Sequence, residues 1–531
     1  MAVGDDAYSA EIPDLASVVV VGGGHNGLIA AAYLARAGVD TVLVEARDDV
    51  GGCASTVTDL GARFNICNCD HTMIRAMPML DELDLASHGL QYLEAEFSMV
   101  HTTYDDDPSW VFHSNVDAHL NDLAHTHPHW VTPYRRYIAD AMPVAKLALE
   151  IARTTPSTRS FLARVAAMRG RGALRLLRWS RLSALEVLNE YFDDWRMWMP
   201  AVATGPTVWG VHPGVPGTGL AAASYATRHV VRTGRPVGGS GALTDALRRS
   251  FEAAGGRTVL GHSVRQLEID TAGVSAIILD DGHRIEARTV IAACDPQRVF
   301  HDWLTADQSG LRSAVSRWRS QPVHDGYESK LDVVLAQRPL FKHETRLAQA
   351  VGREIDVHSP TTVVAPSPDD LEQAHLRRSE GAVADRPTLL INVPTVLDPS
   401  MQLDPSEHVL SLEVLFTPYA HPWTSSPEPE RWLSLLDQLC EPGTLQVKRW
   451  RAMTPDRYER EFSMHRGHTP AFSGPPLQTL IGRRPALTRS RAEIPGLHLS
   501  GAATFPGAGI LGGAGRNAAM KVLADRARRV R

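Results

Sequence analysis

Three glycines near the N-terminus have a spacing that suits phosphate binding. Gly22, Gly24 and Gly27 form the pattern G-x-G-x-x-G between a β-branched run, residues 17–21, and an apolar helical stretch, residues 28–37. The first glycine permits a tight turn, the second lets the backbone approach a pyrophosphate, and the third lets helix and strand pack closely. The free N–H groups at the helix start favour an anion. This order of elements predicts a dinucleotide site.

An acidic residue and a second pair of glycines follow this motif. A second apolar strand is expected at residues 41–44, and Glu45 closes it roughly twenty residues after the glycines. A carboxylate here can accept hydrogen bonds from a pair of ribose hydroxyls, and it disfavours the 2′-phosphate of NADP. Gly51 and Gly52 then suit a loop whose backbone passes close to a long cofactor. We therefore expect FAD rather than NAD.

Two distant segments carry related patterns. The glycine-rich run 237–242 opens a predicted helix that ends near residue 254. Short strands are expected after it, at residues 259–260, 264–269, 274–279, 283–287 and 289–293. Near the C-terminus, a strand at 497–500 leads through a glycine-dense loop into a predicted helix at 518–529. A glycine-rich loop before a helix N-terminus is typical of anion binding.

These motifs resemble those of a known family. The stretch from Val18 to Gly52 resembles the N-terminal fingerprint of the large FAD family that contains amine oxidases and phytoene desaturases, and residues 237–296 resemble the middle of the same FAD domain. The chain is identified as a member of the phytoene desaturase-related FAD-dependent oxidoreductases. The resemblance implies that FAD is bound by Gly22, Gly24, His25, Asn26, Gly27, Glu45, Ala46, Arg47, Gly51, Gly52, Cys53, Val264, Gly501, Ala502, Gly509, Ile510 and Gly513.

The implied fold class is α/β, with two domains that are both discontinuous in the sequence. A Rossmann-like FAD-binding domain is expected from residues 15–105, 236–305 and 485–531. An α+β substrate-binding domain, with a mixed sheet and a helical lid, is expected from residues 106–235 and 306–484. Its strand candidates are residues 330–336, 387–393 and 409–416, and residues 134–200 are expected to be helical.

Some positions depart from the family pattern. Cys53 stands where many amine oxidases have a basic residue, and the loop 502–506 lacks the aromatic pair that brackets the flavin in monoamine oxidases. Both differences weigh against amine oxidation. The segment 65–71, which the resemblance places near the isoalloxazine, is unusual in carrying two cysteines and His71. We predict His71 as the catalytic base, because a histidine can titrate near neutral pH. The alternative is a hydrogen-bonded structural histidine.

The predicted activity is the desaturation or dehydrogenation of a largely apolar organic substrate by hydride transfer to flavin. In such enzymes the cofactor carries the difficult step and the protein supplies binding and orientation. Two alternatives stay open. One is a redox-neutral, FAD-dependent isomerase or cyclase, and the other is a non-catalytic FAD-binding scaffold protein.

The overall composition limits the partners and the location. The chain has 531 residues and a net charge of −6, which gives no global field for nucleic acid, so no nucleic-acid partner is expected. The five cysteines indicate a reducing compartment, and no metal-ligand spacing is complete. No basic, apolar leader and no apolar run of about 18 residues is present, so we expect a cytoplasmic protein.

The segment 151–185 is unusually rich in arginine. It holds eight arginines and no Asp, Glu or Lys, interleaved with leucine, phenylalanine and tryptophan. This composition suits a helix that lies on anionic lipid, which would make the protein a peripheral membrane protein. The favoured alternative is a lid or packing helix whose arginines pair with acidic residues of this chain, and an acidic protein partner is a third alternative. A break between two helices is expected at Gly170 and Gly172.

Overall fold

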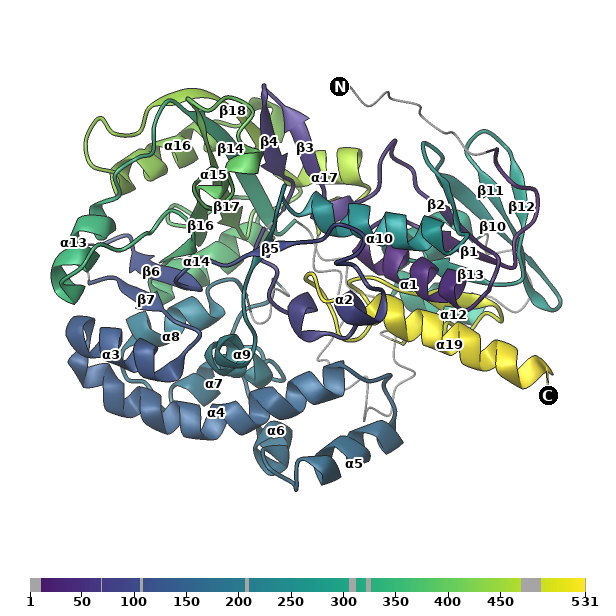
Figure 1. Cartoon of the computed structure of the whole chain (residues 1–531), viewed down its shortest axis with the longest axis horizontal. Coiled ribbons are helices and arrows are strands. Elements are labelled where there is room, and N and C mark those ends of the chain that lie inside the picture. The colour runs from purple at the N-terminus through teal and green to yellow at the C-terminus, as the bar shows by residue number, and fades with distance from the viewer. Residues whose placement is uncertain are drawn as a thin grey trace.

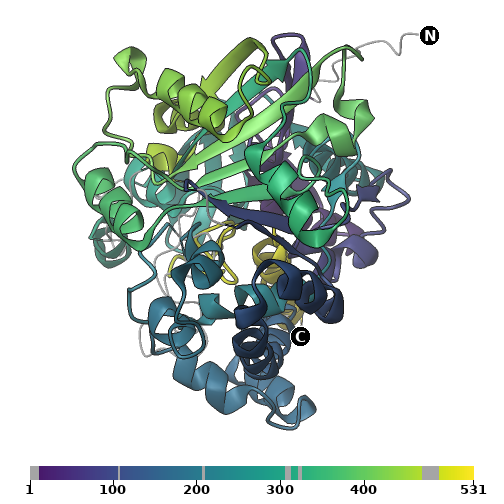
Figure 2. The same cartoon turned by 90° about the vertical axis from the view of Figure 1, so that its left-hand side faces the viewer.

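Two large β-sheets, several smaller ones and a layer of helices form the described part of the protein (Figure 1). The computed structural model describes residues 11–67, 69–105, 108–205, 210–304, 312–320, 326–468 and 489–530. A five-stranded sheet and its helices form one half of the molecule, on the right of Figure 1. In the other half, a seven-stranded sheet lies above the helical layer, as Figure 2 shows from the side. Each sheet combines segments that lie far apart in the sequence.

The five-stranded sheet is parallel throughout and has the order β19-β13-β1-β2-β9. Its strands are β1 (Val18–Val21), β2 (Thr41–Val44), β9 (Arg257–Val259), β13 (Val290–Ala292) and β19 (Leu497–Leu499). All of β1 and β2 is buried, because alternate side chains point to opposite covered faces. Val18 and Val20 pack against helices, whereas Val19 and Val21 pack against a second, three-stranded sheet.

Three helices cover the first face, and a small antiparallel sheet covers the other. The helices are α1 (His25–Arg36), α10 (Gly241–Ala253) and α19 (Gly513–Val530). The sheet strands are β10 (Val264–Asp270), β11 (Gly273–Leu279) and β12 (Arg284–Glu286). This arrangement confirms the predicted Rossmann-like domain. The helix α19 begins five residues before the predicted start, because the glycines at 513 and 515 already belong to its first turn.

The seven-stranded sheet has the order β18-β14-β17-β16-β15-β6-β7. Its strands are β6 (Met99–Thr103), β7 (Trp110–Phe112), β14 (Glu328–Leu335), β15 (Thr361–Ala365), β16 (Leu389–Asn392), β17 (His408–Leu415) and β18 (Val447–Met453). Only β6 and β15 run parallel, so the sheet is mixed, as predicted. The strands β14, β16 and β17 match their predicted ranges to within two residues. One face packs against α13 (Lys342–Val351) and α16 (Glu428–Leu439).

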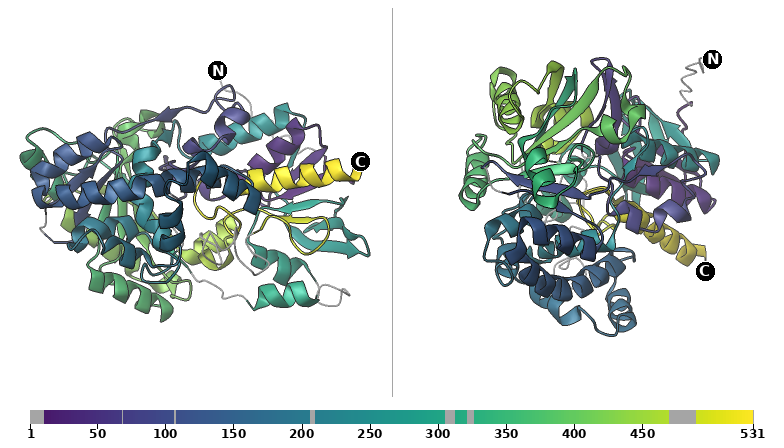
Figure 3. Two further views of the ribbon diagram at one scale, coloured as in Figure 1. Left: turned by 90° about the horizontal axis from the view of Figure 1, so that it is seen from below. Right: turned by 60° about the vertical axis from the view of Figure 1, so that its left-hand side comes forward.

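The opposite, inner face of this sheet faces the helical layer (Figures 1 and 3). Aromatic side chains fill the interface between them. Tyr134, Tyr137 and Tyr225 belong to this buried cluster, together with Trp110 and Phe112 of β7. The helices of the layer are α3 (Val116–Thr126), α4 (Val131–Ala152), α5 (Thr158–Ala167), α6 (Ala173–Trp179), α7 (Ala184–Leu188), α8 (Trp195–Val202) and α9 (Ser224–Val230).

Shorter elements connect these layers. They are α2 (Met79–Glu82), β3 (Thr56–Asp59), β4 (Ala62–Asn65), β5 (Tyr92–Leu93), β8 (Arg235–Pro236), α11 (Pro296–Arg298), α12 (Arg312–Arg319), α14 (Pro368–Ser379), α15 (Pro394–Leu397) and α17 (Pro455–Phe462). The expected helix break is confirmed, because Gly170 and Gly172 have φ angles of +71° and +77° between α5 and α6.

Two of the predicted domain boundaries separate a secondary-structure element from the residues against which it packs. The range 15–105 includes β6, yet β6 pairs with β15 in the seven-stranded sheet. The range 306–484 includes α12, yet Val315 and Trp318 of this helix pack in the core beside the five-stranded sheet. The structure therefore assigns β6 to the second unit and α12 to the first. Both assignments depend on contacts between segments distant in sequence.

Candidate functional site

The glycine motif forms the turn between β1 and α1. At Gly22 φ is +105°, and an added Cβ would lie 2.9 Å from the carbonyl oxygen of Ala293. At Gly27 an added Cβ would lie only 1.9 Å from the carbonyl oxygen of Gly22. By contrast, the nearest protein atom to a Cβ on Gly24 is the Gly51 oxygen, at 4.0 Å. Gly22 and Gly27 are thus required by packing, whereas Gly24 leaves open space at the start of a helix.

The acidic residue after β2 is bound to this turn. One carboxylate oxygen of Glu45 accepts a hydrogen bond from the Gly23 N–H at 2.6 Å, and the other accepts one from the Arg47 N–H at 3.0 Å. The Gly51 N–H donates to the Gly23 carbonyl at 2.9 Å, so the two glycine loops lie side by side. The predicted ribose acceptor and both predicted glycine loops therefore occupy one location.

A second helix N-terminus reaches the same location from the C-terminal segment. The Gly515 N–H in the first turn of α19 donates to Oδ1 of Asn26 at 3.2 Å. An added Cβ on Gly515 would lie 2.2 Å from the Asn26 carbonyl oxygen. The starts of α1 and α19 therefore meet, and each contributes unpaired N–H groups and a positive dipole end. This pair of helix ends suits a pyrophosphate, and the predicted residues Gly509, Ile510 and Gly513 lie in the segment that leads into it.

The remaining predicted FAD residues are arranged around this centre. His25 begins α1, and burial lowers its pKa to about 4. Arg47 donates to Oγ of Ser55 at 3.0 Å. Cys53 Sγ lies 3.7 Å from Sδ of Met464 in the substrate-domain loop.

Four further predicted FAD residues lie beside this centre. The His262 N–H donates to the Glu45 carbonyl at 3.1 Å, which brings the chain just before Val264 beside β2. Gly501 and Ala502 follow β19, and the Ser500 N–H donates to the Ala292 carbonyl of the neighbouring strand. Ala46 lies between Glu45 and Arg47, whose N–H donates to the Glu45 carboxylate. The predicted cofactor set is thus gathered at one edge of the five-stranded sheet.

The predicted base, His71, is fully buried and hydrogen-bonded. Its Nδ1 lies 3.0 Å from the Tyr92 hydroxyl, and its Nε2 lies 3.2 Å from Oγ of Ser240. Burial lowers the pKa of His71 to about 3, so the ring is neutral at physiological pH. These contacts match the structural alternative, and a catalytic role for His71 stays a prediction. Asn68, in the same unusual segment, lies outside the described residues.

The sequence reasoning missed a set of charged residues on the inner face of the seven-stranded sheet. Lys330 and Asp332 of β14 form a buried ion pair, and Arg451 Nη2 lies 2.8 Å from the same Asp332 carboxylate. Lys330 Nζ also donates to the Asn65 carbonyl at 2.6 Å, so the segment after β4 lies against this face. Burial raises the pKa of Glu413, opposite Lys330, to about 8. The sequence feature that could have revealed this charged set is the presence of charged residues at alternate positions within predicted buried strands.

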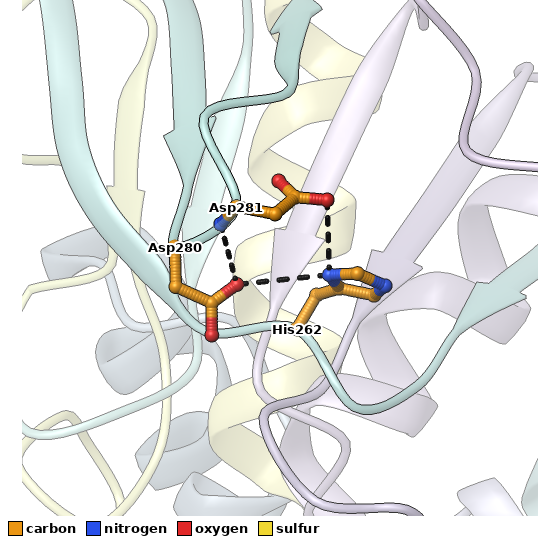
Figure 4. Close-up of side chains that lie close together, drawn as sticks. All are labelled: His262, Asp280 and Asp281. Carbon is orange, nitrogen blue, oxygen red and sulfur yellow. Dashed lines mark hydrogen bonds and ion pairs between the residues drawn. The ribbon is translucent and has the colours of Figure 1, made fainter.

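Three potential metal-ligating side chains lie close together elsewhere (Figure 4). His262 Nδ1 lies 3.6 Å from an Asp280 oxygen and 3.5 Å from an Asp281 oxygen. The Asp281 N–H also donates to Asp280. Both carboxylates are exposed, and the contacts within the turn account for the arrangement. No metal is assigned to it.

A cleft of about 490 Å³ lies beside the segment that holds His71. Its lining includes Asp70 and Arg235 together with residues 93–98, 113–115 and 229–234. Polar groups dominate its walls, including His113, which is paired with Asp122. The cleft therefore gives solvent a path to the Asp70–Arg235 pair.

The arginine-rich helices α5 and α6 project from the helical layer, at the bottom of Figure 1. In the segment 151–185, four arginines make ion pairs with acidic residues, namely Arg153, Arg164, Arg175 and Arg178. Within the described residues, four others make no ion pair, namely Arg159, Arg169, Arg171 and Arg181. Leu162 and Leu174 are strongly exposed beside them in the sequence. The pairs support the lid interpretation, and membrane contact stays a prediction. No described helix combines the length and apolarity needed to cross a bilayer.

Comparison with known proteins finds related oxidoreductases that align with most of this chain. Residues 27–327, more than half of the sequence, match the family of flavin-containing amine oxidoreductases. The chain is 28% identical to pyridine nucleotide-disulfide oxidoreductase domain-containing protein 2 of Rattus norvegicus, over 96% of this chain and 93% of that protein. It is 24% identical to a limonene dehydrogenase polypeptide of Castellaniella defragrans, over 96% and 94%. It is 25% identical to the lycopene-forming phytoene desaturase of Pantoea ananas, over 93% and 96%.

Solved structures share the fold. A putrescine oxidase variant superposes with a TM-score of 0.62 at 18% identity, covering 97% of this chain and 99% of that one. Cyclohexylamine oxidase from Brevibacterium oxydans gives a TM-score of 0.58 at 14% identity, with 97% and 100% covered. These matches support the two-part α/β architecture described above.

Proposed function

The chain belongs to the flavin-containing amine oxidoreductase family and is an FAD-dependent oxidoreductase; we propose that it dehydrogenates a largely apolar organic substrate. The observation that carries the proposal is the full-length similarity to a limonene dehydrogenase polypeptide and a phytoene desaturase. Both relatives are named for the oxidation of hydrocarbons. The resemblance of phytoene desaturases to this chain was expected from its motifs, and the comparison confirms it.

The residues present fit FAD. The open space in front of Gly24 admits a phosphate, and the facing starts of α1 and α19 supply N–H groups for its charge. Glu45 already accepts two backbone hydrogen bonds and holds its carboxylate beside the glycine turn, where a ribose diol can bind. When bound, FAD supplies a hydride acceptor for a substrate C–H bond.

The chain's own residues orient the substrate and exclude water. The inner face of the seven-stranded sheet packs against the aromatic layer of α4, α8 and α9. Tyr134, Tyr137 and Tyr225 are fully buried in this packed core, which holds the substrate-side sheet and helices together. Near the segment 65–71, burial leaves His71 neutral and, with a pKa of about 3, only weakly basic, whereas the raised pKa of Glu413 keeps that carboxyl protonated at neutral pH.

Anaerobic mixing tests the proposal. FAD-loaded protein is mixed with limonene, with a long polyene hydrocarbon, and with putrescine or cyclohexylamine as amine controls. Stoichiometric bleaching of the flavin by an apolar substrate, with formation of a new double bond, is the expected result. Bleaching by the amines alone would overturn the apolar-substrate proposal. Product formation without bleaching would favour the redox-neutral isomerase or cyclase.

A further inference from the structure

The helix α17 belongs to the second unit and lies where the two halves of the molecule meet (Figure 1). It begins directly after Thr454, which follows β18 of the seven-stranded sheet. The loop after the helix is fastened to the same unit. The Arg466 N–H donates to Oε1 of Glu459 at 2.8 Å, and the Gly326 N–H donates to the Arg466 carbonyl at 2.9 Å. The position of α17 is therefore set by the second unit.

One face of α17 contacts the cofactor segments of the first unit. Tyr458 and Phe462 are one helical turn apart, so their side chains lie on the same face. The Tyr458 hydroxyl donates to the Ile66 carbonyl at 3.0 Å. The guanidinium of Arg47 lies over the Phe462 ring, with Cζ 4.3 Å from the ring centroid. A single helical face thus joins the segment after β4 and the loop after β2.

A further contact comes from the loop that follows α17. Met464 is buried, and its Sδ lies 3.7 Å from Sγ of Cys53, which directly follows the second glycine pair. Met464, Tyr458 and Ile66 belong to one buried cluster, and the side chains of Cys53 and Phe462 pack against it. This cluster combines residues of both units. The contact between α17 and the cofactor loops is therefore a packed interface.

Phe462 and Ser55 hold the Arg47 guanidinium beside the expected phosphate position. Nη1 of Arg47 donates to Oγ of Ser55 at 3.0 Å. Oγ of Ser55 lies against the second glycine loop, because a Cβ added to Gly51 would clash with it. The same loop borders the open space at Gly24, where the nearest protein atom to an added Cβ is the Gly51 oxygen. The guanidinium thus lies next to the loop that borders the space for the FAD diphosphate.

The Arg47 side chain is suited to bind an anion in this place. It is partly exposed and makes no ion pair within the described part of the chain. Its guanidinium stays protonated and has N–H donors besides the one that Ser55 accepts, in a fork that matches phosphate. An aromatic face attracts a cation without using its N–H donors. Phe462 can therefore fix the guanidinium and leave its remaining donors free for the cofactor.

We propose that Phe462 is a positioning residue of the FAD site, which holds the Arg47 guanidinium towards the diphosphate of FAD. The cofactor is then bound by both units, and α17 is the contribution of the substrate-binding unit. This role rests on the binding of FAD at the glycine loops and does not depend on which substrate is dehydrogenated.

A double-mutant cycle on FAD affinity tests this role. The variants are Phe462→Leu, Arg47→Gln and their combination, and FAD is titrated into each apoprotein while flavin fluorescence is followed. Leucine keeps an apolar side chain against the cluster but removes the aromatic face. Phe462→Leu should weaken FAD binding by about threefold to tenfold. In the Arg47→Gln background it should cause no further loss, because the ring then has no guanidinium to hold.

Three more variants complete the test. Phe462→Tyr keeps the ring and should bind FAD as tightly as wild type, whereas Phe462→Met, a second apolar replacement, should behave like Phe462→Leu. Phe97→Leu is the matched control, because the guanidinium of Arg353 lies over the Phe97 ring, 5.3 Å from its centroid, in the core of the seven-stranded sheet. It should leave FAD affinity unchanged. Thermal unfolding of the apoproteins confirms that each variant is folded.

Three outcomes would overturn the proposal. Equal losses of affinity from Phe462→Leu with and without Arg47 would show that Phe462 supports the site by packing alone. Wild-type affinity in both Phe462→Leu and Phe462→Met would show that the ring is not needed. Wild-type affinity in Arg47→Gln would show that the guanidinium does not contact FAD. Because the titration uses no substrate, failure of the hydrocarbon bleaching assay leaves its result interpretable.

Discussion

Alanine at Gly24 and at Gly27 should separate cofactor binding from folding. The two residues lie one turn apart at the start of α1, yet an added Cβ meets nothing closer than 4.0 Å at Gly24 and lies 1.9 Å from the Gly22 oxygen at Gly27. Gly24 has φ −68° and ψ 168°, which alanine adopts without strain. Gly24→Ala should therefore leave the apoprotein as stable as wild type. Gly27→Ala should destabilise it by about 1–3 kcal/mol through overpacking.

The effect of Gly24→Ala on FAD affinity should be large, although its effect on the stability of the apoprotein is small. The methyl group that Gly24→Ala adds occupies the space where the backbone must approach the pyrophosphate, so charge-assisted hydrogen bonds worth about 1.5–3 kcal/mol are lost. This corresponds to a decrease in affinity of roughly 10- to 150-fold. Thermal unfolding of the apoproteins gives the first quantity, at roughly 2–4 °C per kcal/mol for a domain of about 150–250 residues. Titration with FAD, followed by fluorescence, gives the second.

Two outcomes would refute this reasoning. If Gly24→Ala bound FAD as tightly as wild type, the pyrophosphate would not lie at the start of α1. If Gly27→Ala unfolded at the wild-type temperature, the strand and helix would not pack as described. Gly38, where an added Cβ meets nothing within 4 Å but φ is +75°, gives a comparison for backbone strain alone.

Four further expectations follow from other contacts. Glu45→Gln should weaken FAD by about 1.5–3 kcal/mol in the same titration, and unchanged affinity would argue against a ribose contact. Asp332→Asn should lower the free energy of unfolding by about 3–5 kcal/mol, because it leaves the buried cations of its ion pairs unmatched; urea denaturation measures this, with exposed Asp81→Asn as the control. The folded pKa of His71 is about 3, below the unfolded value near 6.5, so its stabilising effect is complete above pH 6.5 and is lost as the pH falls towards 3. Urea denaturation between pH 7 and 4 should show this decline, and His71→Gln should reduce its slope. Flotation with anionic vesicles at low and high salt tests the lipid prediction, with wild type compared with a variant in which the four unpaired arginines become glutamate: Arg159, Arg169, Arg171 and Arg181. If the wild-type protein stays at the bottom of the gradient at low salt, the lipid prediction is wrong and the lid interpretation remains.

The cofactor site was predictable because its signals are local. The turn at Gly22–Gly27 and the carboxylate of Glu45 lie within one strand–helix–strand unit. Packing within this unit requires Gly22 and Gly27, and Gly24 leaves space for the phosphate. The strands β14, β16 and β17 were also predictable, since their apolar alternation is visible within a few residues. The meeting of Asn26 with Gly515 was implied only by the family resemblance, because it joins residues at opposite ends of the chain.

The domain ends and the polar interior needed the three-dimensional structure. The sequence of β6 is that of an ordinary short strand, and only its pairing with β15 assigns it to the seven-stranded sheet. His71 looked like a base because histidine titrates near neutral pH, but sequence does not show that Tyr92 and Ser240 bind both of its nitrogens.

The charged side chains on the inner side of the seven-stranded sheet bear on the kind of substrate that can lie against it. Lys330 and Arg451 are matched by Asp332 and Asp59, and burial raises the pKa of Glu413 to about 8, so this region is close to neutral at physiological pH. An apolar molecule can lie against such groups without leaving a charge exposed to it.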